Sequence, residues 1–129
     1  MEVDTRCNIR CTMCPIAHDL VENQGRVTVD TIEKLCQLAV GWTDKISLAV
    51  MGEPLLHPDC PEMIRRIKKY NLSALVWTNG LLVNERRARE ILEAGLDKLI
   101  FSFEIIDKEL HERVRVGAKY DKVRRNLDN

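Results

Sequence analysis

Short apolar runs alternate along the chain with segments in which apolar residues recur at helical spacing. The runs cover residues 46–51, 74–78 and 99–103, and residues 2–5 look like the end of an earlier run. Apolar runs of this length are typical of strands that are buried on both faces of a parallel sheet. The pattern therefore predicts four strands, the first of which ends just before a loop rich in cysteine.

The segments between these runs predict amphipathic helices. Each predicted start combines a side chain that can cap a helix with a following apolar stripe, and the starts lie at Thr28, Pro58 or Asp59, Asn84, Asp107 and near Tyr120. Gly95 is suited to end the third helix, because glycine readily adopts the left-handed conformation that is common there. The residues predicted to face the core are Ile32, Leu35, Leu38, Ala39, Met63, Ile64, Ile67, Ala88, Ile91, Leu92, Leu110 and Val114.

The alternation of strands and helices predicts an α/β fold in which parallel strands are joined by right-handed helical crossovers. Each predicted strand ends at a polar or glycine-bearing loop: the cysteine loop, residues 51–54, residues 78–80 and residues 102–104. In parallel α/β folds the loops at the carboxyl ends of the strands form the functional face. These four loops should therefore lie together on one rim.

Composition narrows the class of protein. Apolar residues make up 45% of the 129 residues and charged residues 31%, as in soluble globular domains. The formal net charge of zero argues against nucleic acid or an anionic membrane as the main partner. No apolar stretch approaches the roughly 20 residues of a membrane-spanning helix, and the first residues do not predict an export signal.

The distribution of the five cysteines indicates metal or redox chemistry. Three of them lie within residues 7–14, which does not suit a disulfide framework. Clustered cysteines without an export signal are typical of metal or redox ligands in a reducing compartment, so we predict a cytoplasmic protein. Cys36 and Cys60 fall in predicted helices and are expected to be structural.

The three clustered cysteines are spaced so that their thiols can converge. Cys7, Cys11 and Cys14 are four and three residues apart, the steps that place side chains on one side of a near-helical loop. A four-iron cluster normally takes four cysteines, so three would leave one iron open to a ligand that is not protein. Alternatively, His18 would complete a closed Cys3His zinc site. The spacing by itself leaves both interpretations open.

Four motifs in order resemble the radical S-adenosylmethionine (radical SAM) superfamily. The C-x3-C-x2-C spacing in residues 7–14 is similar to the signature of that superfamily, MGEPLLHPD in residues 51–59 to its Gly-Gly-Glu-Pro stretch, and WTNG in residues 77–80 to its Thr-Asn-Gly turn. Residues 95–116 resemble the branch that often carries an additional cysteine-rich SPASM domain. Met51 departs from the usual first glycine of the second motif.

The resemblance implies a cofactor set and a reaction. Cys7, Cys11 and Cys14 would each bind one iron of a 4Fe–4S cluster, and SAM would chelate the open iron. Reductive cleavage of SAM would give a 5′-deoxyadenosyl radical that abstracts hydrogen from an unknown substrate, a peptide or small molecule, in peptide or cofactor maturation. The electron would come from a donor such as flavodoxin or ferredoxin.

The resemblance also implies contacts to SAM, and no catalytic residue beyond the cluster is assigned. Glu53 would supply a carboxylate to the cationic amino group of SAM. The other implied contacts are the carbonyls of Met51 and Gly52, the polar groups of Thr78, Asn79 and Ser102, Glu104 toward the ribose, and Met13 against the adenine. His57 is expected to hold its own loop.

The length predicts only part of a barrel. A complete eight-fold barrel needs about 250 residues, whereas residues 1–129 would supply about four β/α units, a half-barrel fragment of TIM type. We therefore predict the N-terminal portion of a radical SAM core domain, truncated before its later strands, whose exposed strand edges can self-associate. The other hypothesis is a non-catalytic metal-binding module, with zinc on Cys3His, or an inactive fragment.

Overall fold

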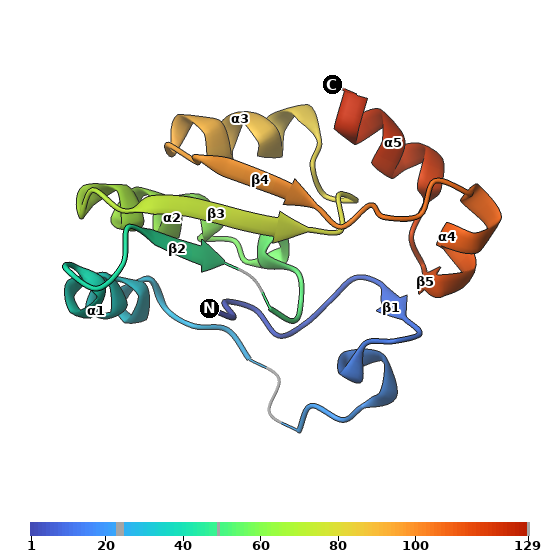
Figure 1. Cartoon of the computed structure of the whole chain (residues 1–129), viewed down its shortest axis with the longest axis horizontal. Helices are drawn as coiled ribbons and strands as arrows, with labels where there is room; N and C mark the ends of the chain where they lie inside the picture. The colour runs from blue at the N-terminus through green and yellow to red at the C-terminus, as the bar shows by residue number, and fades with distance from the viewer. Residues whose placement is uncertain (23–24, 49, 129) are drawn as a thin grey trace.

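A parallel sheet of three strands forms the centre of the computed structural model, which describes residues 1–22, 25–48 and 50–128. The strands lie in the order β2 (Lys45–Leu48), β3 (Ser73–Thr78) and β4 (Lys98–Phe101). Ile46 pairs with Ala74, and Val76 pairs with Leu99. All three strands point toward the part of the molecule that holds β1 (Arg10–Cys11), α4 (Lys108–Val114) and β5 (Arg115–Val116), as Figure 1 shows. The predicted α/β class with parallel strands is confirmed.

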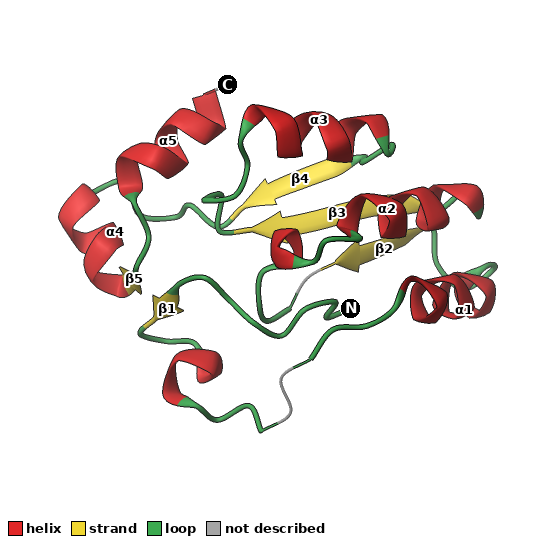
Figure 2. Cartoon of the chain, turned by 180° about the vertical axis from the view of Figure 1, so that it is seen from behind, coloured by secondary structure: helices red, strands yellow, loops and turns green. Residues whose placement is uncertain are grey.

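Three helices cover one face of this sheet, as Figure 2 shows from behind. They are α1 (Val29–Ala39), α2 (Cys60–Lys69) and α3 (Glu85–Glu93). The predicted caps are confirmed for α1, where the Thr28 side chain accepts a bond from the Thr31 amide, and for α3, where Asn84 accepts one from the Arg87 amide. The helix α2 follows Asp59, at the second of the two predicted starts.

The last part of the chain lies beyond the carboxyl ends of the strands. The helix α4 (Lys108–Val114) is capped by Asp107 and leads directly into β5 (Arg115–Val116), and α5 (Tyr120–Asp128) follows. β5 pairs in antiparallel fashion with β1 (Arg10–Cys11), so that Cys11 lies opposite Arg115. Short 3-10 helices occupy Pro15–His18 and Pro54–Leu56. The pairing of β1 with β5 joins the cysteine loop to the end of α4.

The predicted first strand is not part of the sheet, so the described residues form three parallel strands rather than four. Residues 2–5 contribute only an isolated antiparallel bridge between Asp4 and Arg26. The backbone of this segment is bonded instead to residues 25–27: the Thr5 amide donates to Gly25 and the Val27 amide donates to Val3. β3 ends at Thr78 as predicted, and β4 ends at Phe101, two residues before its predicted end. β2 is described as far as Leu48, and the predicted strand residue Ala49 lies outside the described residues.

The core lies between the sheet and the helices. Alternate residues of β3, Ala74 and Val76, are fully buried against α2. Met63, Ile64 and Ile67 are buried as predicted.

Leu38 and Leu92 were predicted to face the core, and these two predictions are wrong. Their side chains are 76% and 66% exposed. Leu38 lies two residues, about 200° around the helix, from buried Cys36, and so points to the opposite side of α1. Leu92 lies about 100° around the helix from buried Ile91. Because α3 buries only a narrow stripe, this rotation leaves the Leu92 side chain outside the stripe. Leu110 is 38% exposed for a similar reason, since α4 buries only His111.

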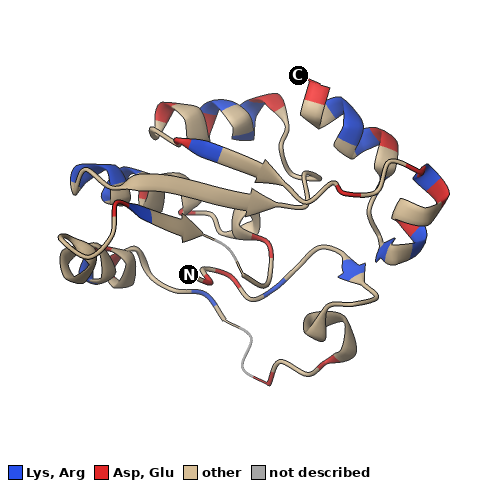
Figure 3. Ribbon diagram, viewed as in Figure 1, with Lys and Arg blue, Asp and Glu red and all other residues tan. Residues whose placement is uncertain are grey.

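Charged side chains of both signs are interspersed on the outer faces of the helices (Figure 3). The most connected group joins α1 to α2: the carboxylate of Glu33 accepts bonds from Tyr70 at 2.6 Å, Lys69 at 2.9 Å and Arg66 at 3.1 Å. These bonds hold the two helices side by side. Among the described residues, no helix has the length and apolar character needed to cross a membrane.

Candidate active site

A cavity of about 300 Å³ lies at the carboxyl ends of the three parallel strands. Each of the four strand-end loops named from the sequence contributes to its wall, so the prediction that they meet on one rim is confirmed. The lining residues are Cys7, Ile9, Cys11, Met13, Cys14, Val50, Met51, Gly52, Glu53, Pro54, Trp77, Thr78, Asn79, Ser102 and Arg115.

All three clustered cysteines line this cavity. Cys7 and Cys14 are half-buried, and Cys11 lies in β1 at 9% exposure. The Cys14 amide donates to the Cys11 carbonyl at 3.0 Å, which closes the loop between these two cysteines into a turn. Burial raises the pKa of the Cys7 and Cys11 thiols, so that in the metal-free protein both are held in the protonated form.

The geometry does not favour the Cys3His zinc interpretation. The Nε2 atom of His18 is 2.7 Å from the Thr12 carbonyl on an exposed part of the loop. In residues 1–22, 25–48 and 50–128, no three His, Cys, Asp or Glu side chains converge closely enough to hold a single metal ion. A cluster makes a different demand, since each cysteine binds a different iron and the sulfurs need not meet at one point.

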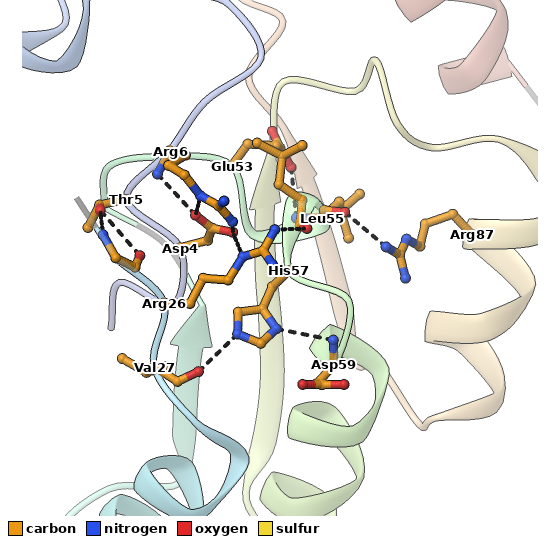
Figure 4. A network of polar contacts seen from close by, with 12 residues as sticks. Asp4, Thr5, Arg6, Arg26, Val27, Glu53, Leu55, His57, Asp59 and Arg87 are labelled. Carbon is orange, nitrogen blue, oxygen red and sulfur yellow. Dashed lines mark hydrogen bonds and ion pairs between the residues drawn. The ribbon is translucent and has the colours of Figure 1, made fainter.

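Gly52 allows the loop after β2 to lie directly on the N-terminal segment. Its φ is +78°, and a Cβ at this position would be 1.9 Å from the Asp4 carbonyl oxygen. Asp4 is itself fully buried: its carboxylate accepts bonds from Arg6 at 2.7 and 2.8 Å and from Arg26 at 2.8 Å (Figure 4). The glycine therefore places the Met51–Pro54 turn against the strand-like segment that leads to Cys7.

Glu53 joins the loop after β2 to the end of β3. Its carboxylate is 1% exposed and accepts bonds from the Thr78 hydroxyl at 2.8 Å, the Asn79 amide at 2.8 Å and the Leu55 amide at 3.1 Å. Burial raises the pKa of Glu53, against the lowering effect of these three donors. The side chain lines the cavity and at the same time fixes the positions of two neighbouring loops.

Asn79 and Ser102 lie where the sequence predicted, at the cavity wall. The Asn79 side chain donates to Asn8 at 2.8 Å, accepts from the Leu81 amide at 3.0 Å, and lies 3.7 Å from the Sγ atom of Cys7. The Ser102 amide donates to the Thr78 carbonyl at 2.8 Å, which continues the ladder between β3 and β4 to the rim.

Glu104 is not among the residues that line the cavity. Its carboxylate is 65% exposed and accepts a bond from the Nη2 atom of Arg115 at 2.5 Å. Met13 lines the cavity but is 63% exposed, so one side of it faces solvent.

Sequence reasoning missed Arg115. Its Nη1 atom is 3.8 Å from the Sγ atom of Cys11, a residue 104 positions earlier. No local signal marks this residue, because its position depends on the register of β1 with β5. The motif in residues 95–116 includes Arg115, but the sequence assigned it no role.

Three further residues have the structural roles expected from the sequence. His57 contacts the Val27 carbonyl at 2.9 Å and accepts a bond from the Asp59 amide, which holds its own loop (Figure 4). Cys36 and Cys60 are fully buried in the main core, and burial raises the pKa of Cys60 to about 12. Both thiols are therefore inert parts of the packing.

The whole sequence, residues 1–129, matches the family described as the Radical SAM superfamily. The chain belongs to this superfamily. Radical SAM enzymes use a 4Fe–4S cluster and S-adenosylmethionine, in agreement with the cofactors predicted above.

Two curated relatives and a solved structure illustrate the similarity. The chain is 31% identical, over 82% of its length, to a tungsten-containing aldehyde ferredoxin oxidoreductase cofactor-modifying protein of Pyrococcus furiosus. It is 31% identical, over 98% of its length, to a GTP 3′,8-cyclase of Chlorobaculum tepidum. It covers 30% and 38% of these two radical SAM relatives.

The fold is also that of a solved radical SAM protein. A crystal structure of BtrN in complex with AdoMet and 2-DOIA superimposes with a TM-score of 0.66 at 23% identity, covering 94% of this chain and 51% of BtrN. The arrangement of strands and helices described above is therefore shared with this protein.

Proposed function

We propose that the chain supplies the cluster-binding and SAM-binding part of a radical SAM enzyme. The observation that carries this proposal is the shared cavity: three cysteines from one loop and the ends of all three parallel strands line the same space. The chain spans less than half the length of the curated relatives named above. The remainder of the site and the substrate contacts would then come from further residues of a longer protein.

The donor set fits a cluster with an open iron. Thiolates are the ligands that iron–sulfur clusters take in proteins, and Cys7, Cys11 and Cys14 present three of them to one cavity. When bound, the cluster and SAM supply a 5′-deoxyadenosyl radical for abstraction of hydrogen from the substrate. Because the thiols must be deprotonated to bind iron, loading of the cluster releases protons and is favoured by higher pH.

The residues around the cysteines are proposed to bind and orient SAM. The carbonyls of Met51 and Gly52, with the buried carboxylate of Glu53 behind them, provide a negative environment for a cationic amino group. Thr78 and Asn79 and the Ser102 hydroxyl border the same space and are proposed to contact the carboxylate or ribose of SAM. Met13 is proposed to pack against the adenine, and Glu104 to reach the ribose only if it leaves Arg115.

The free face of the sheet supports the proposal that residues 1–129 form the N-terminal portion of a partial TIM-type barrel. Leu75, Trp77 and Ile100 lie on the face turned away from the core, and Trp77 is 46% exposed. Apolar side chains on this face are expected where further strands close a barrel around its interior. Self-association through the sheet edges stays a prediction.

The substrate is proposed to be a small molecule in a cofactor-maturation reaction. Of the two classes suggested by the sequence, peptide or cofactor maturation, the second agrees with the Pyrococcus furiosus relative, which is a cofactor-modifying protein. A flavodoxin or ferredoxin as electron donor, the SPASM-associated branch, and a cytoplasmic location stay predictions.

Anaerobic reconstitution with iron and sulfide tests the proposal. We expect the wild-type chain to become brown, with broad absorption near the border of the visible and ultraviolet. Cys7→Ala, Cys11→Ala and Cys14→Ala should each lose this colour, whereas His18→Ala should keep it. Addition of SAM and dithionite, with the products separated by chromatography, should then give methionine and 5′-deoxyadenosine.

Two results would contradict the proposal. One is a colourless chain that holds one zinc ion and loses it in His18→Ala. The other is a brown colour that survives in all three cysteine variants, since the iron would then be bound elsewhere. Cys60→Ala is the matched control, because it removes a buried thiol that lies outside the cavity.

A further inference from the structure

Two of the three candidate cluster ligands receive N–H donors from distant parts of the chain. Asn79 places its Nδ2 atom 3.7 Å from the Sγ atom of Cys7, and Arg115 places its Nη1 atom 3.8 Å from the Sγ atom of Cys11. In the described part of the chain, the Sγ atom of Cys14 has no comparable side-chain donor. The sulfurs are therefore in unequal electrostatic environments.

The guanidinium of Arg115 is fixed in place. Its side chain is 12% exposed, its residue is paired with Cys11 in the β1–β5 register, and its Nη2 atom donates to Glu104. Its Nε atom is buried and has no partner among the described residues. The positive charge of the Arg115 guanidinium is therefore held close to the Sγ atom of Cys11 at the wall of the cavity.

A fixed cation beside a ligating sulfur favours the more negative state of a cluster. N–H bonds to the sulfurs, net charge and burial are among the factors that set the reduction potential of an iron–sulfur cluster. A one-electron reduction adds one negative charge, and the interaction of that charge with a guanidinium is attractive and weakly screened at a buried site. Asn79 acts in the same direction, but as a neutral donor it has the smaller effect.

We propose that Arg115 is a positioning residue that raises the reduction potential of the cluster through Cys11, and that Glu104 limits this effect by partly neutralising the guanidinium. The inference rests on the proposed function, because it requires a cluster on the three cysteines. It assigns opposite effects to two residues that form one ion pair.

A redox titration of the reconstituted chain tests this inference. The cluster is titrated anaerobically with dithionite against mediator dyes, and its reduced form is followed by electron paramagnetic resonance. Arg115→Met removes the charge at similar volume, and we expect about tenfold less reduced cluster at a fixed ambient potential, equivalent to about 59 mV for a one-electron couple. The reduction potential of Arg115→Lys should lie between those of Arg115→Met and the wild type, because lysine keeps the charge but not the planar donor.

Two comparison variants make the test specific. Arg113→Met removes an exposed arginine two residues away and should leave the potential unchanged. Glu104→Gln leaves Arg115 in place without its counter-charge, and we expect the potential to rise. A merely structural role of Arg115 would not produce shifts of opposite sign for the two partners of one ion pair.

The outcomes separate this inference from the proposed function. A wild-type chain that forms no cluster overturns both. A wild-type chain that forms a cluster, with equal potentials in the wild type and Arg115→Met, overturns only the role of Arg115. If Arg115→Met fails to hold a cluster, Glu104→Gln and Arg115→Lys decide: an unchanged or lower potential in Glu104→Gln overturns the inference, and a higher one supports it.

Discussion

Gly52 illustrates how strongly a single residue of this site is constrained. The loop after β2 contacts the backbone of Asp4 at a distance that leaves no room for a side chain, and the glycine also has a positive φ. These two constraints are distinct, because the first concerns space and the second concerns backbone conformation. Both are met at the residue that lies directly before buried Glu53.

Gly52→Ala is expected to lower the free energy of unfolding by about 3 kcal/mol or more, because the strained φ and the overlap with Asp4 add together. Gly41→Ala is the matched control. Gly41 has a φ of +84° but nothing within 4 Å of its Cβ position, so we expect a loss of only about 1–2 kcal/mol. Urea unfolding followed by circular dichroism measures both values, and equal losses would show that the close contact with Asp4 contributes nothing.

At the scale of elements, the pairing of α1 with α2 depends on one carboxylate as well as on the core. Glu33 of α1 faces Arg66 and Lys69 of α2 and Tyr70 just beyond it. The hydrogen bond from Tyr70, followed by those from Lys69 and Arg66, lowers the pKa of Glu33 to about 2. The helix pair therefore carries a pH-dependent link on its outer side.

The sign of this pH dependence follows from the lowered pKa. A carboxyl group whose pKa is lower in the folded state stabilises that state above its unfolded pKa, near 4.5, and loses this contribution as the pH falls toward about 2. We expect Glu33→Gln to lower the melting temperature at pH 7, and the difference from the wild type to shrink between pH 4.5 and pH 2. Thermal unfolding across this range measures it; Glu85→Gln, at an exposed carboxylate of α3, is the control.

At the scale of the whole molecule, the five cysteines divide into two groups according to their place in the fold. Cys7, Cys11 and Cys14 line the cavity, whereas Cys36 and Cys60 are fully buried between the helices and the sheet. In the first group Cys7 and Cys14 are half-buried and accessible to reagents, whereas Cys11 reaches the same cavity at 9% exposure. The second group is closed to reagents unless the molecule unfolds.

Alkylation of the metal-free chain with iodoacetamide should reveal this division. We expect Cys7 and Cys14 to react at alkaline pH, and Cys36 and Cys60 to stay unmodified, because they are buried and the pKa of Cys60 is raised to about 12. Loading of the cluster should protect the cavity cysteines. Peptide mass spectrometry identifies the modified residues, and reaction of all five in urea is the control; labelling of Cys60 in the folded chain would contradict the assigned core.

Much of this arrangement could be predicted from local sequence. Helix starts were identified correctly at Thr28, Asn84 and Asp107, because a cap depends only on nearby residues. The loops after the parallel strands were expected on one rim, because the carboxyl ends of parallel strands lie at the same edge of a sheet. Arg115 could not be found this way, since its contact with Cys11 depends on a pairing across 104 residues. Residues 2–5 failed as a strand because their backbone partners, residues 25–27, lie in a loop.

The pairing of β1 with β5 has a consequence for biosynthesis. The cysteine loop leaves the ribosome before residues 115–116, the segment that pairs with Cys11, which emerges more than 100 residues later. On the proposed function, a cluster loaded onto the nascent polypeptide would therefore meet its complete surroundings only once this late segment has docked.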